Sequence, residues 1–108
     1  MAEHPTYVAV VQVLLSDPRV VEVKMFGMPT LKVGGKAFAS LWENGDLVVK
    51  IGAPRVHELL TAKAGRQFDP SGKGRPMKEW IMIKAPAAQA KKKWLTLAEE
   101  AKAFVDQP

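Results

Sequence analysis

Residues 30–51 read TLKVGGKAFASLWENGDLVVKI, three short apolar runs separated by Gly34-Gly35 and Asn44-Gly45. Glycine and asparagine accept the positive φ angles of tight turns, and Asn-Gly is the preferred dipeptide of a type I′ turn. The last run places three apolar residues on one face of a strand, namely Leu47, Val49 and Ile51. The stretch therefore predicts an antiparallel meander of three or four strands joined by hairpins.

Further strand signals flank this meander. Val21, Val23 and Met25 alternate with charged residues, a period of two that predicts a strand with one buried face. Residues 80–83 are apolar throughout and predict a central strand. Residues 66–77 are rich in glycine and proline, so this stretch predicts an irregular loop.

Three segments show helical periodicity. The first covers residues 5–16 and ends at Asp17-Pro18, because proline disfavours a helical residue before it. The second begins at residues 52–54, where a proline in the first turn loses no hydrogen bond. It ends at Gly65, which we expect to be a left-handed cap.

The third helix is expected to begin at Pro86. Its apolar stripe consists of Ala90, Trp94, Leu97, Ala101 and Phe104. Residues 96–99 also match a capping box, which would start a new helix at that point. We favour one continuous helix, because the apolar stripe runs through both halves.

The order of these elements predicts an α+β fold in which helices back an antiparallel sheet. With 108 residues, 47% of them hydrophobic, the chain is expected to form one domain, residues 1–108, with one core. It has no cysteine, so disulfides, a thiolate nucleophile and a cysteine zinc site are excluded. The longest apolar run, residues 7–15, is too short to span a membrane and carries no features of a secretory signal. We therefore expect a cytoplasmic protein.

The net charge of +5 is concentrated in one part of the chain. Residues 1–62 carry six basic and six acidic side chains, whereas residues 63–93 carry nine basic and two acidic ones. The candidate anion or nucleic-acid contacts in this stretch are Lys73, Arg75, Lys78, Lys91, Lys92 and Lys93. Two interpretations stay open: a solvated lysine-rich surface, or a surface that attracts nucleic acid, a phosphorylated ligand or an acidic protein face.

The loop at residues 71–75 is the best ligand-site candidate in the sequence. Its glycines expose backbone N–H groups beside two cations, an arrangement that favours a phosphate. It lacks the spacing of a Walker A loop or of a dinucleotide-binding turn, and exposed connections have the same composition.

No catalytic or metal-binding motif is present. The two histidines are His4, near the terminus, and His57, in the second helix, and no serine or acid is placed by a motif to join either of them. We expect no enzymatic activity, no metal and no cofactor. The alternative hypothesis of an enzyme would have to be built around His57.

The aromatic residues bear on nucleic-acid binding, because single-strand binders stack bases on exposed rings. Five of them lie inside predicted elements and are expected to be core, namely Phe38, Trp42, Trp80, Trp94 and Phe104. Trp42 shares a strand face with Ser40, which leaves exposure of this ring open.

Several segments together resemble the N-terminal domain of the TfoX/Sxy family. They are residues 25–27 (MFG), 31–39 (LKVGGKAFA), 45–50 (GDLVVK) and 74–80 (GRPMKEW), together with Trp94 in the last helix. The resemblance covers roughly residues 7–105, and a weaker one connects the chain to YjbR/MmcQ-like proteins.

The resemblance implies a two-layer sandwich of order α-β-β-β-α-β-β-α, like the secretion chaperones, with a strand near residues 66–69. It also implies a bacterial regulatory protein, since TfoX/Sxy proteins regulate competence for DNA uptake. We expect a non-enzymatic regulatory or protein-interaction module, monomeric or homodimeric, whose partner is another protein. The alternative is weak, salt-sensitive nucleic-acid binding through residues 63–93.

Overall fold

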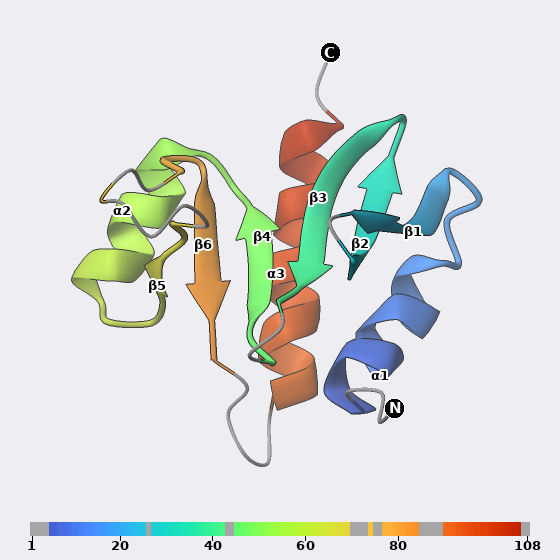
Figure 1. Ribbon diagram of the computed structural model, residues 1–108, viewed down its shortest axis with the longest axis horizontal. Coiled ribbons are helices and arrows are strands. Elements are labelled where there is room, and N and C mark those ends of the chain that lie inside the picture. Colours follow the sequence, from blue (N-terminus) through green and yellow to red (C-terminus); the bar gives the residue numbers. More distant parts are fainter. Residues whose placement is uncertain are drawn as a thin grey trace.

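The computed structural model describes residues 5–25, 27–42, 45–69, 74, 77–84 and 90–106. They form three helices and a six-stranded antiparallel sheet of order β1-β2-β3-β4-β6-β5 (Figure 1). The elements are α1 (Pro5–Leu14), β1 (Val20–Met25), β2 (Met28–Val33), β3 (Lys36–Leu41), β4 (Leu47–Lys50), α2 (Ala53–Thr61), β5 (Arg66–Gln67), β6 (Trp80–Ile83) and α3 (Ala90–Val105). This arrangement confirms the predicted α+β fold class.

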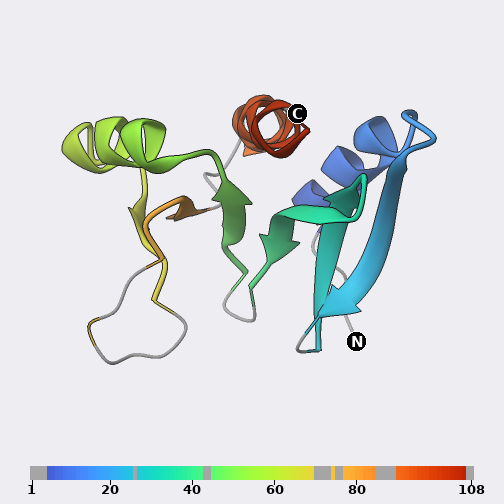
Figure 2. The ribbon, with the colours of Figure 1, turned by 90° about the horizontal axis from the view of Figure 1, so that it is seen from above.

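All three helices lie on the same side of the sheet, and the other side carries no helix (Figure 2). The fold is therefore a two-layer sandwich. α3 contacts β2, β3 and β4 as well as α1, so it crosses the centre of the sheet. α3 is also joined to α2, because the Arg55 guanidinium of α2 donates a hydrogen bond of 2.8 Å to Glu100 of α3.

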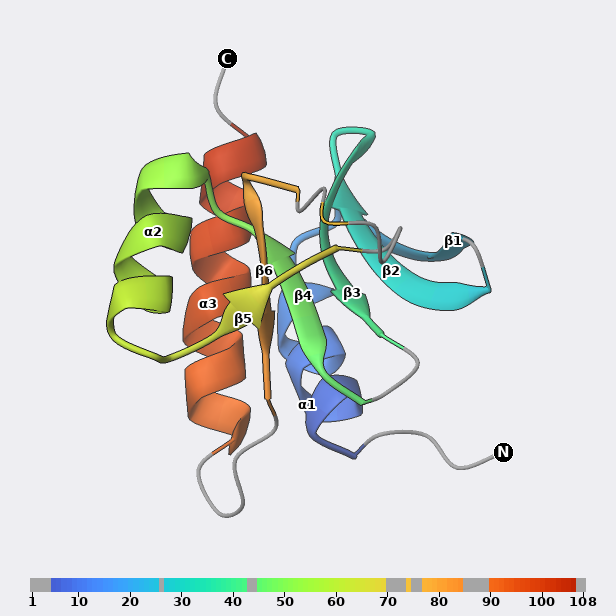
Figure 3. The same ribbon diagram turned by 60° about the vertical axis from the view of Figure 1, so that its left-hand side comes forward.

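The order of elements differs from the expected one at one point. Four strands precede α2, whereas the resemblance implied three. The strand that it implied near residues 66–69 exists as β5, which lies beside β6 at the opposite edge from β1 (Figure 3). The prediction of a loop from residue 66 was therefore wrong at Arg66 and Gln67, because two residues are too few to show a period.

The meander forms as its turns predict. Gly34 and Gly35 have φ angles of 57° and 79° and join β2 to β3. Gly45 has a φ of 89°, while Asn44, the other residue of the second predicted turn, lies outside the described residues. Leu47, Val49 and Ile51 are all buried in the core, which confirms the predicted face of β4.

The core lies between the helices and the sheet. Its largest fully buried side chains are Trp94 of α3 and Phe38 of β3. The indole N–H of Trp94 donates to the carbonyl oxygen of Lys84 at 3.2 Å, which ties α3 to the end of β6. Removing so large a buried side chain costs about 3–5 kcal/mol in comparable proteins.

α3 is continuous from Ala90 to Val105, as we favoured. The hydroxyl group of Thr96 donates to the carbonyl oxygen of Lys92 at 2.9 Å, an i to i−4 bond inside a helix and not a cap. The predicted start at Pro86 lies outside the described residues. Leu15, by contrast, follows the end of α1 and is exposed, although the first predicted helix covered residues 5–16.

The end of α2 corrects a second prediction. The left-handed residue there is Lys63, with a φ of 58°, and not Gly65. Gly65 is required for a different reason, since a Cβ atom at this position would lie 2.7 Å from Cδ1 of Ile81. The glycine lets the chain pass close to β6.

β1 presents the face opposite to the one expected. Val20 is buried against the helices, whereas Val21 is 48% exposed. Val23 and Met25 lie on the same face as Val21, because alternate residues of a strand share a face. The apolar alternation of β1 therefore belongs to the side of the sheet without helices. No helix formed by the described residues combines the length and the apolar character needed to cross a membrane.

Candidate binding groove

The side of the sheet without helices carries one continuous row of side chains. The strand register places these residues opposite one another: Val23, Thr30, Ser40, Val48, Met82 and Arg66. Val48 is 1% exposed although no helix covers it. Side chains from the loops and the neighbouring strands must therefore rise around it.

These side chains enclose an apolar groove of about 540 Å³. Its aromatic wall is formed by Trp42, Phe68 and Trp80, and Thr30, Ser40 and Val48 lie along its floor. Ala37 and three methionines complete the lining. Pockets of this volume and composition commonly receive ligands or anchoring side chains.

The aromatic wall is a packed row of rings. Trp42 meets Phe68 edge-on, with ring centroids 4.8 Å apart and an angle of 83° between the planes. Phe68 in turn lies 6.3 Å from Trp80 at 51°. Edge-to-face packing of this kind stabilises a ring arrangement beyond the area that it buries. The wall is therefore held in place before anything binds.

This wall corrects the expectation for two of the five aromatic residues. Phe38 and Trp94 are fully buried in the core, and Phe104 packs against it. Trp42 and Trp80 are half-buried and line the groove, so the prediction that they are core was wrong. The shared strand face of Trp42 and Ser40, visible in the sequence, is confirmed because both line the groove.

Methionines gather on this side of the molecule. Met25, Met28 and Met77 line the groove, and Met82 lies on the same face of the sheet opposite Val48. They are four of the five methionines in the chain. Because a thioether side chain is unbranched and polarizable, it adapts to ligands of varied shape.

Two hydroxyl groups form the polar centre of the floor. Thr30 donates to the carbonyl oxygen of Met28 at 3.2 Å, and Ser40 donates to that of Pro29 at 3.0 Å. The two hydroxyl oxygens lie 3.2 Å apart. Each hydroxyl group thus has a backbone carbonyl and the other hydroxyl within hydrogen-bond distance, and the pair is the polar feature of an otherwise apolar floor.

Three carboxylates among the described residues on this side of the sheet lie beside neighbouring groups. The nearly buried Asp46 pairs with Arg66, and Glu79 lies 3.7 Å from Lys50. Asp69 accepts a hydrogen bond of 2.8 Å from the backbone N–H of Gly74. That N–H belongs to the loop predicted to bind an anion, and in the structure it serves a carboxylate of the protein.

Of the candidate anion or nucleic-acid contacts, the structure describes the side chains of Lys78, Lys92 and Lys93, and it does not place Lys78 beside the other two. Lys78 is exposed and precedes β6, whereas Lys92 and Lys93 are exposed in the first turn of α3, near the far end of β6. The length of β6 separates the two groups. Lys73 and Arg75 lie outside the described residues, as does the side chain of Lys91, whose backbone is part of α3.

His57 is exposed on α2 and lines neither the apolar groove nor the cleft between α1 and α3 described below. Among the residues that the structure places, no group of three or more histidine, aspartate or glutamate side chains is arranged to hold a metal ion.

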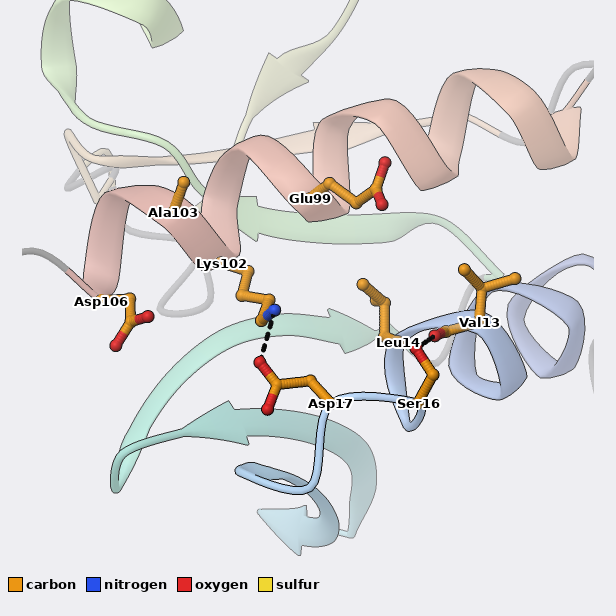
Figure 4. A pocket seen from close by; sticks show the side chains of 8 residues that line it. All are labelled: Val13, Leu14, Ser16, Asp17, Glu99, Lys102, Ala103 and Asp106. Carbon is orange, nitrogen blue, oxygen red and sulfur yellow. Dashed lines mark hydrogen bonds and ion pairs between the residues drawn. The ribbon is translucent and has the colours of Figure 1, made fainter.

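A second cleft of about 280 Å³ lies where the end of α1 meets α3 (Figure 4). Lys102 reaches across it to Asp17 at 2.7 Å, and Arg19 pairs with Asp106 through two hydrogen bonds of 2.7 and 3.1 Å. The ammonium group of Lys102 and the backbone N–H of Arg19 hold the pKa of Asp17 well below its usual range. Arg19 likewise lowers the pKa of Asp106.

These ion pairs connect the segment after α1 to α3. The four charged groups are paired with one another, so few of them are available to bind a ligand. The apolar groove is therefore the candidate site. Sequence reasoning did not find the groove, although the alternation of β1 and the shared face of Trp42 and Ser40 were signals of it.

Comparisons with protein-family models, with curated proteins and with solved structures found no match to this chain. The resemblance to TfoX/Sxy N-terminal domains stays a prediction from the sequence.

Proposed function

We propose that this protein is a non-enzymatic interaction module with a regulatory role of the TfoX N-terminal type. Its partner is another protein, and its working surface is the apolar groove on the side of the sheet without helices. The observation that carries this proposal is the exposure of Trp42, Trp80 and Met77 around one groove, where water meets a largely apolar lining.

Binding energetics support a groove of this kind. Burying one large apolar side chain contributes about 1.5–3 kcal/mol, so a few anchors supply much of a specific affinity. Tryptophan and methionine are both enriched at protein interfaces. The packed ring wall reduces the ordering entropy that a partner must offset on binding.

The test is a pull-down from cell extract with and without nuclease. The bait carries either Met77→Asp or Leu15→Asp, two substitutions at sites with 42% and 43% exposure on opposite sides of the molecule. We expect a protein partner that is retained after nuclease treatment, lost with Met77→Asp and kept with Leu15→Asp. Circular dichroism of both variants controls for folding.

Two results would refute the proposal. If the captured material disappears with nuclease, the partner is nucleic acid, and the alternative of nucleic-acid binding through residues 63–93 replaces this function. If Met77→Asp captures the same partner as the unchanged chain, the groove is not the working surface.

A further inference from the structure

The groove is small compared with an interface between two folded domains. Ten residues line it, whereas a standard protein interface uses about 20–30 residues on each side. A groove of about 540 Å³ holds a few large side chains. It therefore fits the anchors of one short segment better than the face of a second copy of this chain.

The walls suit bulky, variable anchors. Met25, Met28 and Met77 supply three flexible thioether side chains, while Trp42 and Trp80 supply wide apolar surfaces. Methionine-rich surfaces repack around different apolar partners. The groove thus selects for size and apolarity more than for one particular side chain.

The charges around the groove favour a partner that is negatively charged. Asp46 and Glu79 lie beside cationic partners, and Asp69 accepts a hydrogen bond from a backbone N–H, as described above. Lys32 lies on the groove face of β2, opposite the groove residue Ala37, and Lys78 directly follows Met77.

Neither of these lysines takes part in an ion pair between described residues. Two cations are thus added to a rim on which Asp46 and Glu79 already have cationic partners. Charge complementarity then directs an acidic segment to this side of the molecule.

The rings are poorly placed for nucleic acid. Base stacking needs open ring faces, and here Trp42 and Phe68 contact each other edge-on. The contacts among the rings occupy part of the surface that base stacking would use, so the side chains of a peptide fit this groove better than bases do.

We infer that the groove binds a short acidic segment of a partner protein, which inserts two or three bulky apolar side chains between the ring wall and the methionines. This inference rests on the proposed function and adds the chemistry of the partner.

The test uses a phage-displayed library of random 12-residue peptides. The library is selected on the full chain and counter-selected on Met77→Asp. We expect enriched peptides to contain more Asp and Glu than Lys and Arg, and at least two large apolar residues. A synthetic copy of an enriched peptide should shift the tryptophan emission of the protein and bind Met77→Asp about tenfold more weakly.

A matched pair of double variants tests the charge. Lys32→Glu with Lys78→Glu changes the rim, whereas Lys92→Glu with Lys93→Glu makes the same change in net charge at the start of α3. We expect the first pair to weaken peptide binding about tenfold and the second to change it less than about twofold. Equal effects of the two pairs would overturn the inference of an acidic partner.

The remaining outcomes separate this inference from the proposed function. Enriched peptides that are neutral or basic, yet depend on Met77, would overturn the acidic chemistry and leave the interaction module standing. A selection with no peptide that distinguishes Met77→Asp from the unchanged chain would overturn both. Oligodeoxythymidine or dodecanoate could also displace the peptide. If either does so at a concentration below that of the peptide itself, the groove belongs to another class of ligand.

Discussion

Single residues in this protein take roles that their sequence neighbours do not reveal. Asp17 was expected only to end the first helix, together with Pro18. In the structure its carboxylate also accepts a bond from Lys102 on α3, 85 positions along the chain. Such a pairing depends on where α3 lies, so no local pattern could have predicted it.

This pairing has a consequence for the pH dependence of stability. The folded-state pKa values of Asp17 and Asp106 are lowered by Lys102 and Arg19. The stabilisation is therefore present above the unfolded pKa of about 3.9 and is lost as the pH falls through the lower folded values. We expect the free energy of unfolding to decrease below about pH 4.

The measurement is urea unfolding between pH 2 and 6. Asp17→Asn should flatten the acid limb of the curve, because the variant has no carboxyl to protonate at that position. Glu99→Gln, in the same cleft, is the control. An acid limb equally steep in the unchanged chain and in Asp17→Asn would contradict the role of the pairing.

Among the elements, those defined by short-range chemistry could be predicted. The turn at Gly34 and Gly35 and the buried face of β4 follow from residues that are adjacent in sequence. β5 could not be found in this way, because Arg66 and Gln67 become a strand only by pairing with Met82 and Ile81. The role of Gly65 was misassigned for the same reason, since it depends on β6.

A substitution at Gly65 tests the close approach of α2's end to β6. In Gly65→Ala the new methyl group would lie 2.7–2.8 Å from side-chain atoms of Ile81 and Ile83. We expect a loss of about 1–3 kcal/mol in the free energy of unfolding, which is typical of overpacking. Lys63→Ala, two residues earlier and exposed, should change stability far less. An unchanged midpoint of urea unfolding in Gly65→Ala would show that the core yields at this position.

At the scale of the whole molecule, the groove exists because the register joins distant strands. Met28, Ser40, Phe68 and Trp80 come from separate segments, and only the completed sheet brings them together. The sequence identified the strands and one shared face, but not which face the helices would leave uncovered. That choice depends on the packing of α3, which covers the face with Leu31, Val49 and Ile81.

The position of the three tryptophans gives a direct check of this arrangement. Trp42 and Trp80 line the groove, whereas Trp94 is fully buried. We expect acrylamide to quench the emission of the unchanged chain several times more strongly than that of Trp42→Phe with Trp80→Phe, which retains only Trp94. Similar quenching constants would place the groove tryptophans in the core and remove the candidate site.

The shortness of β5 also bears on whether the sheet can be extended at that edge. An unpaired strand at the rim of a sheet serves as a template on which a foreign strand can extend it, and successive additions lead to fibrils. With only Arg66 and Gln67, both exposed, this rim offers two residues of backbone and one charged side chain. Growth of the sheet past β5 is therefore disfavoured at this edge.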